Sequence, residues 1–265
     1  MRMSRGVAAG VPYAAVGTGP PVLVSSGLWP TTGVDSDAMV TGAIAPLKKV
    51  AAQRTLVVVN RRPGMPSGLG MRGIAAEYAD AVRAEFGGRV DVLGCSTGGS
   101  IAQQLAVDHP DVIGRLILVS TACRLGAETK HNQALTGRLL RENRKRDAMA
   151  IAAMEFMPPG LGPLGRAAGW VSANHVVPDD AEAADLATTL EAEDAFDLAA
   201  LSPPISAPTL IVGGDRDKFY PRTLFEETAA LIPDSTLLMV PGKGHIGVTS
   251  SARAQTAVAD FLLAG

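Results

Sequence analysis

One short segment has the residue types and the spacing of an activated serine. Residues 94–98 are Gly-Cys-Ser-Thr-Gly, which fits the pattern G-x-S-x-G. An apolar run at 90–94 predicts a buried strand before the serine, and the apolar spacing at 100–108 predicts a helix after it. A sharp turn between strand and helix would lift the hydroxyl clear of the sheet, and the glycines permit such a turn. We therefore predict Ser96 as a nucleophile.

Cys95 is the chemical rival of Ser96, because a thiolate is also a nucleophile. If Cys95 took the place of the serine in this pattern, a glycine would be needed at position 97, where a threonine stands. We expect Cys95 to be a small buried residue beneath the turn. The following helix would direct its N-terminal N–H groups towards Ser96, where they favour a developing oxyanion.

A serine hydroxyl needs a neutral imidazole to accept its proton and a carboxylate to hold the imidazole in the right tautomer. The chain has four histidines. His109 ends the helix after the serine, about 18 Å along it, and His131 and His175 lie in a long segment without strands. His245 follows the last strong strand, and parallel sheets place their sites at the carboxyl ends of strands. We predict His245 as the base.

Two carboxylates compete to be the acid of this group. Asp215 and Asp217 both follow the predicted strand at 209–213, so both would lie at the same sheet edge as Ser96. We expect the one that does not contact the histidine to cap the turn or to pair with Arg216 or Arg222.

A series of short apolar runs, rich in β-branched residues, must position these side chains. Nearly continuous apolar runs of this kind are typical of strands covered by helices on both faces. Strand and helix alternate, which predicts an α/β protein with a doubly wound, mostly parallel sheet. Two weaker runs near 2–7 and 12–16 could add an antiparallel edge. The strand runs lie at 21–26, 55–60, 90–94, 116–120, 209–213 and 236–240, and helical spacing occurs at 75–86, 100–108 and 248–263.

The alternation stops after the fourth strand run. Residues 122–206 have no convincing strand and contain helix-like stretches broken by prolines, so we predict a helical insertion between core segments 1–121 and 207–265. Its first helix, expected at 138–147, carries five basic residues, and its last, at 179–197, carries eight acidic residues. We interpret these as solvated faces that pair with each other; a charged binding surface is the alternative.

Composition excludes several classes of protein. The 265 residues are 47% hydrophobic and 19% charged, which excludes intrinsic disorder. The sequence contains no run of about 18 apolar residues, the length that a membrane-spanning helix needs. A net charge of −2 lacks the basic excess of a nucleic-acid binder. Cys95 and Cys123 make no disulfide framework, and Gly10 and Pro12 interrupt the N-terminal apolar stretch. We expect a cytoplasmic protein, and the sequence leaves a homo-oligomer open.

These motifs together resemble the α/β-hydrolase fold superfamily. Residues 94–99 resemble its nucleophile elbow, 214–221 its G-x-x-D-x-x-x-P pattern, and 242–245 its G-x-G-H loop. The order serine, aspartate, histidine is that of the superfamily. The resemblance implies that Asp217 is the acid and that the insertion is the helical cap of the family.

The resemblance also implies an oxyanion hole. Its donors would be the backbone N–H groups of Leu28 and Thr97, and each is worth roughly 3–4 kcal/mol in the transition state. Two segments depart from the family pattern. Ser-Gly stands at 26–27 where the family often has His-Gly, and the loop at 60–67 keeps little of D-x-R-G-x-G-x-S. Backbone donors do not depend on side-chain identity, so the first change need not abolish the hole.

The predicted reaction is hydrolysis of a small apolar ester or lactone through an acyl-enzyme, without metal or organic cofactor. Trp29 would line the substrate pocket, with packing inside the cap as the alternative for Met149 and Met154 among the residues that would roof it. The expected roof residues are Met149, Met154, Phe156, Met157 and Trp170. The sequence shows no cluster of Arg or Lys at the expected cleft that would bind an anionic substrate. We expect Arg62 to brace a loop.

Other functions are compatible with the same residues. The elbow is also similar to those of cofactor-free haloperoxidase-type perhydrolases, and thioesterases and C–C bond hydrolases share the triad. A ligand-binding receptor that keeps a slow triad is an alternative of another class.

Overall fold

The computed structural model describes residues 3–158 and 160–264. Eight strands form one sheet, and each of the six strong apolar runs forms a strand within three residues of its predicted bounds. The early runs form an antiparallel edge as predicted, with residue 2 outside the described residues. The strands are β1 (Met3–Ala8), β2 (Val11–Gly17), β3 (Pro21–Ser25), β4 (Thr55–Val59), β5 (Val90–Cys95), β6 (Ile113–Val119), β7 (Thr209–Gly214) and β8 (Ser235–Val240).

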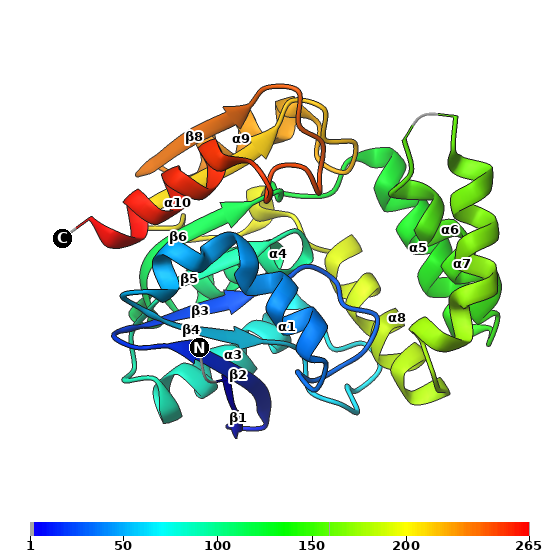
Figure 1. The fold of residues 1–265 in the computed structure, drawn as a ribbon, viewed down its shortest axis with the longest axis horizontal. Coiled ribbons are helices and arrows are strands. Elements are labelled where there is room, and N and C mark those ends of the chain that lie inside the picture. Colours follow the sequence, from blue (N-terminus) through cyan, green and yellow to red (C-terminus); the bar gives the residue numbers. More distant parts are fainter. Residues whose placement is uncertain (1–2, 159, 265) are drawn as a thin grey trace.

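The strand order is β1-β2-β4-β3-β5-β6-β7-β8 (Figure 1). The pairs β1–β2 and β2–β4 are antiparallel, and all pairs from β4 to β8 are parallel. The carboxyl ends of β3, β5, β6, β7 and β8 therefore lie at one edge of the sheet, so residues that are far apart in the sequence can meet there.

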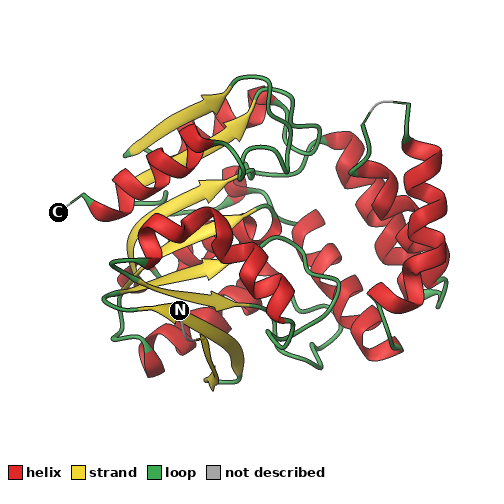
Figure 2. Cartoon of the chain, in the orientation of Figure 1, coloured by secondary structure: helices red, strands yellow, loops and turns green. Residues whose placement is uncertain are grey.

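Helices cover both faces of the sheet, which explains why its inner strands are largely apolar (Figure 2). Along β3, Val22 and Val24 belong to the core on one face and Leu23 to the core on the other. One face is covered by α1 (Asp37–Ile44), α2 (Lys48–Ala51) and α10 (Ala252–Leu263), and the other by α3 (Met71–Glu85), α4 (Thr97–Asp108) and α9 (Arg222–Leu231). None of the helices in the described part of the chain is long and apolar enough to cross a membrane.

The helical insertion between β6 and β7 consists of α5 (Ala127–Arg141), α6 (Lys145–Glu155), α7 (Gly162–Val176) and α8 (Asp180–Asp194). It has a small apolar core of its own, which includes Leu139, Ala148, Leu186 and Leu190. In Figure 1, α5, α6 and α7 stand apart from the sheet, whereas α8 lies between them and the core.

The prediction of one helix over 138–147 is wrong. Helix α5 ends at Arg141 and α6 begins at Lys145, because the chain turns at Asn143 with φ 59°. Asparagine adopts this left-handed conformation more readily than most residues, so it can end one helix and start the return of the next.

The predicted pairing of the basic and acidic helices is present at two places. Arg141 lies 2.8 Å from Glu191, and Lys145 lies 3.1 Å from Asp180. The prediction that the acidic face is solvated is wrong for Asp185 and Glu193, which are buried. Asp185 bonds to the loop after β4 and Glu193 to the first residue of α4, so α8 connects the helical insertion to the sheet edge.

Candidate active site

The chain makes a strained turn at Ser96, between the last residue of β5 and the first residue of α4. Its φ of 52° and ψ of −127° lie in a region that non-glycine residues seldom adopt. The flanking glycines are needed because the backbone is crowded. A Cβ at Gly94 would lie 2.6 Å from the carbonyl oxygen of Gly98, and a Cβ at Gly98 would overlap the carbonyl oxygen of Ser26. The turn thus places the serine hydroxyl at the carboxyl edge of the sheet.

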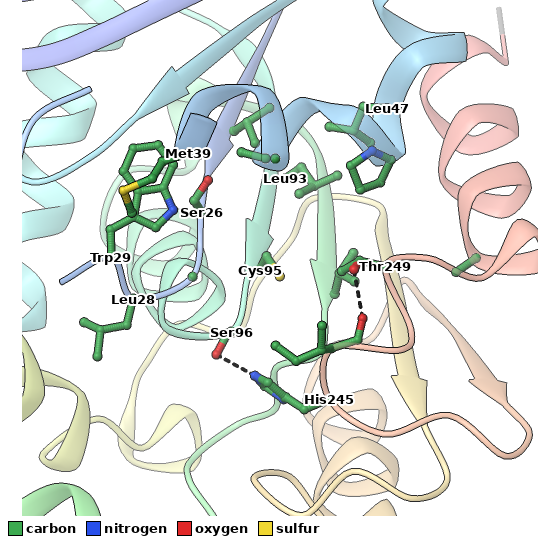
Figure 3. Close-up of a pocket in the computed structure, with 18 of the residues that line it drawn as sticks. Ser26, Leu28, Trp29, Met39, Leu47, Leu93, Cys95, Ser96, His245 and Thr249 are labelled. Atoms are coloured by element: carbon green, nitrogen blue, oxygen red, sulfur yellow. Dashed lines mark hydrogen bonds between the residues drawn. The ribbon is translucent and has the colours of Figure 1, made fainter. Parts of the chain in front are cut away.

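The structure brings the three predicted residues together. His245 Nε2 lies 2.9 Å from Ser96 Oγ, and His245 Nδ1 lies 2.9 Å from Asp217 Oδ2 (Figure 3 shows the contact with Ser96). The Asp217 side chain is fully buried, and that of His245 is 10% exposed. The imidazole ring is stacked on Phe219, with ring centroids 4.3 Å apart. In this geometry the histidine can donate from Nδ1 to the carboxylate and accept from the serine at Nε2.

Backbone donors separate the roles of the two competing aspartates. Asp217 Oδ1 accepts N–H bonds from Phe219 at 2.9 Å and from Tyr220 at 3.1 Å, which leaves Oδ2 for His245. Asp215 Oδ1 instead accepts the N–H of Gly242 at 2.6 Å. Asp215 therefore caps the turn that leads to His245, and Asp217 is the carboxylate that contacts the imidazole.

The loop after β3 passes directly beside Ser96, as an oxyanion loop would. A Cβ on Gly27 would lie 3.4 Å from Ser96 Cβ, and Leu28 borders the same cavity as the serine. Thr97 is the first residue of α4, so its N–H is among those that have no partner within the helix. The two predicted donors, Leu28 and Thr97, therefore flank the serine.

Sequence reasoning missed the side chains that hold this loop. Buried Arg61 donates from Nη2 to the carbonyl oxygen of Trp29 at 2.6 Å, and burial lowers the pKa of its guanidinium. Asn60 Nδ2 donates to Thr31 and Gly33 carbonyl oxygens, each at 2.8 Å. Neighbouring Arg62 braces its own loop, as expected, through Glu77 at 2.9 Å.

A buried carboxylate from α8 lies behind the serine, and it was also missed. Glu193 accepts hydrogen bonds from Thr97 Oγ1 at 2.8 Å, Tyr220 Oη at 3.1 Å and Ser100 Oγ at 3.3 Å. Burial raises its pKa above the ordinary value. Because Thr97 is a predicted oxyanion donor and Tyr220 holds Asp217, Glu193 connects the helical insertion to both parts of the site.

Comparison with known proteins places the chain in a family. Residues 17–260 match the family model described as the alpha/beta hydrolase family. The chain belongs to this family. It is 28% identical over 203 residues to the pimeloyl-(acyl-carrier protein) methyl ester esterase of Neisseria meningitidis serogroup B, covering 72% of this chain and 75% of that protein. As a member of a family whose relatives are named hydrolases and esterases, the chain is an enzyme.

Solved structures share the fold of this hydrolase over nearly its whole length. An alpha/beta hydrolase from a Medee basin deep-sea metagenome library has a TM-score of 0.77 at 14% identity, covering 99% of this chain and 98% of that one. The enol-lactonase of Burkholderia xenovorans LB400 has a TM-score of 0.74 at 22% identity, covering 98% of this chain and 99% of that one. At identities this low, the comparison shows that the fold is shared but does not identify the substrate.

The thiol of Cys95 is not poised for chemistry. Cys95 is partly buried at the end of β5, and burial raises the pKa of its thiol to about 12. A thiol with this pKa stays protonated at neutral pH and is a poor nucleophile. The expectation of a small buried residue is met only in part, because Cys95 is partly exposed and borders a cavity at Ser96.

Two cavities meet at Ser96. The larger, which we call the core cavity, has a volume of about 410 Å³ and lies between α1 and α10 (Figure 3). The smaller, which we call the insertion cavity, has a volume of about 70 Å³ and lies between the serine and helices α5, α6 and α8. Phe156 borders both cavities.

Only some of the residues predicted to form the substrate pocket border a cavity at Ser96. Trp29 borders the core cavity, and Met157 borders an outer cleft beside His245. Met149 and Phe156 border the insertion cavity as expected, whereas Met154 and Trp170 border neither cavity at Ser96, so the expected roof is present only in part. Trp170 is 45% exposed on α7 and lies under the guanidinium of Arg146, because α7 packs on α6 instead of on the core.

Proposed function

We propose that this hydrolase cleaves carboxylic esters, lactones included, through an acyl-enzyme on Ser96. The proposal is carried by the two 2.9 Å contacts that join Ser96, His245 and Asp217. His245 accepts the serine proton as Oγ attacks the carbonyl carbon, and then gives that proton to the leaving alcohol. Water attacks the acyl-enzyme with the same help from His245, which releases the acid and restores the serine.

The transition state needs donors for its negative oxygen. The N–H groups of Leu28 and Thr97 serve as these donors, and each contributes roughly 3–4 kcal/mol. Arg61 supports the first donor by holding the loop at Trp29, and Glu193 supports the second through the Thr97 hydroxyl. The names of the methyl ester esterase and of the enol-lactonase favour an ester or lactone over other acyl compounds.

A labelling experiment tests the nucleophile. A fluorophosphonate probe should modify Ser96, located by peptide mapping, and Ser96→Ala should abolish both the label and the hydrolysis of p-nitrophenyl esters, by about 10⁴-fold or more. Cys95→Ala is the matched control one residue away and should keep the label. A label on any other residue would overturn the assignment.

Separate activity and binding assays distinguish the other functions that this arrangement of residues could have. Peroxide-dependent bromination of monochlorodimedone in acetate, faster than ester hydrolysis, would indicate a perhydrolase. Preferred cleavage of thioesters or of a C–C bond would indicate the related hydrolases. Tight binding of an apolar ligand with about one turnover per molecule would indicate a receptor.

A further inference from the structure

The core cavity and the insertion cavity differ in chemistry as well as in size. The floor of the core cavity is the sheet itself, at Val24, Leu93 and Val119 on adjacent strands β3, β5 and β6. Its walls are α1 with the short 3₁₀ helix after it, and α10, where Ala43 and Ala254 leave space open. Figure 3 shows these walls on either side of Leu93, with Ser96 and His245 at the mouth.

The core cavity holds no fixed charge. Among its lining residues that the structure describes, none is an Asp, Glu, Lys or Arg. A ligand group with a charge would lose its hydration there without gaining an ionic partner, which is costly. An apolar chain would instead gain free energy for each methylene that leaves water.

The insertion cavity is also lined mostly by apolar side chains, but it contains carboxyl groups, which the core cavity lacks. Glu193, Gln133 and Glu155 line it, and burial raises the pKa of both carboxyl groups. Gln133 Nε2 donates to Glu193 at 3.3 Å, and Asn132 Nδ2 donates to Glu155 at 2.8 Å. A chain placed here would cover these polar groups with carbon, and about 70 Å³ holds only a small substituent.

We propose that the substrate carries an uncharged apolar chain, and that this chain lies in the core cavity between α1 and α10 and not beneath the helical insertion. The inference rests on the proposed ester hydrolysis and names its substrate class. The volume of about 410 Å³ falls within the usual range of ligand pockets, roughly 300–1,000 Å³. Because Ser96 and His245 form the mouth, a carbonyl at the serine sends one of its two substituents into this cavity.

Chain-length profiles test the proposal. We would measure kcat/KM on p-nitrophenyl alkanoates from acetate to dodecanoate, and on alkyl acetates of the same range. In one of the two series, kcat/KM should rise by about fourfold per methylene until the cavity is full. The series that rises shows whether the acyl chain or the alcohol chain enters the core cavity. Neutral chains should be preferred over chains of equal length that end in a carboxylate.

Three phenylalanine variants locate the chain. Ala43→Phe should lower kcat/KM for the longest good substrate by about 15- to 60-fold, because the ring takes the space of two to three methylenes, and should spare the acetate. Ala38→Phe, on the exposed side of the same helix, should leave the profile unchanged. Ala152→Phe, which fills the insertion cavity, should not shift the preferred length. Met39→Ala enlarges the core cavity and should extend that length.

The outcomes separate this inference from the function on which it rests. If esters are hydrolysed at Ser96 but Ala43→Phe leaves the profile of the folded protein unchanged, the inference is wrong and the function stands. If Ala152→Phe shortens the preferred chain instead, the chain lies beneath the helical insertion. If no ester is hydrolysed and Ser96 takes no label, the function and the inference both fall.

Discussion

Replacing Asp217 with asparagine should invert the tautomer of His245. In the native site Oδ1 accepts two backbone N–H groups, from Phe219 and Tyr220, and Oδ2 faces His245 Nδ1. Asparagine has one acceptor oxygen, and the two backbone donors will hold it on their side. The amide NH₂ then faces Nδ1 and donates to it, so the ring proton must sit on Nε2. An Nε2–H cannot accept the proton of Ser96.

The expected magnitudes follow from these bonds. A wrong tautomer should lower kcat by about 10⁴-fold, or about 5 kcal/mol of transition-state free energy. The free energy of unfolding should change by only about 1 kcal/mol, because both backbone bonds survive. Asp217→Ala should also lower the free energy of unfolding, by about 2–6 kcal/mol, because it leaves two buried N–H groups without an acceptor.

The assay is p-nitrophenyl ester hydrolysis combined with urea unfolding of the same samples. Asp215→Asn is the control, since it changes the neighbouring carboxylate that caps Gly242, and its activity should stay within about tenfold of the native enzyme. If folded Asp217→Asn keeps more than a tenth of the native kcat, the reasoning about the tautomer is refuted. If kcat falls equally in both asparagine variants, the cause would be a general disturbance of the loop that carries Asp215 and Asp217.

Three further changes test the surroundings of the triad. Glu193→Leu should lower kcat about tenfold with little change in KM, because Thr97 loses its acceptor; Glu193→Gln should restore much of it. Burial and Glu193 raise the pKa of Asp194 to about 7, so the folded state keeps a proton that the unfolded state releases near pH 4. Stability should therefore fall between about pH 4 and pH 7, and Asp194→Asn should reduce that fall in Tm, with the buried Glu193 and Glu155 contributing the remainder. Gly98→Ala should cost about 1–3 kcal/mol of unfolding free energy and displace the loop after β3 from Ser26 onwards, measured by urea unfolding and ester hydrolysis.

The sheet could be predicted because its signal is local. Five consecutive β-branched or apolar residues fit a strand covered on both faces, and the order of such runs predicts the parallel topology. The segment at 37–51 gave no such signal, since its helices are short and contain Gly42 within α1 and Pro46 within the 3₁₀ helix that follows. That segment forms one wall of the core cavity, so the sequence did not reveal the largest space at the serine.

Ser96 and His245 could be predicted for a similar reason: each follows a strand, and the carboxyl ends of parallel strands meet. That position does not separate Asp217 from Asp215, and only the resemblance to the family pattern favoured Asp217. Glu193 and Arg61 could not be predicted, because the burial of a charge depends on partners distant in sequence. Glu193 and its donor Thr97 are 96 residues apart. Nothing within the acidic helix separates a carboxylate that bonds to the core from one that faces water, except its position around the helix.

That position supplies the signal that sequence reasoning overlooked. Glu182, Asp185 and Glu193 are spaced by three and then eight residues, which places them on one face of α8. Each bonds to the segment that follows a different strand. Glu182 accepts the N–H of Thr32 at 2.7 Å after β3, and Asp185 that of Met65 at 2.7 Å after β4. Glu193 accepts from the hydroxyl of Thr97, the first residue of α4 after β5. Helix α8 therefore belongs to the insertion by sequence and to the sheet edge by its hydrogen bonds. An isolated core that ended before this helix would leave the two backbone N–H groups and the Thr97 hydroxyl without these acceptors.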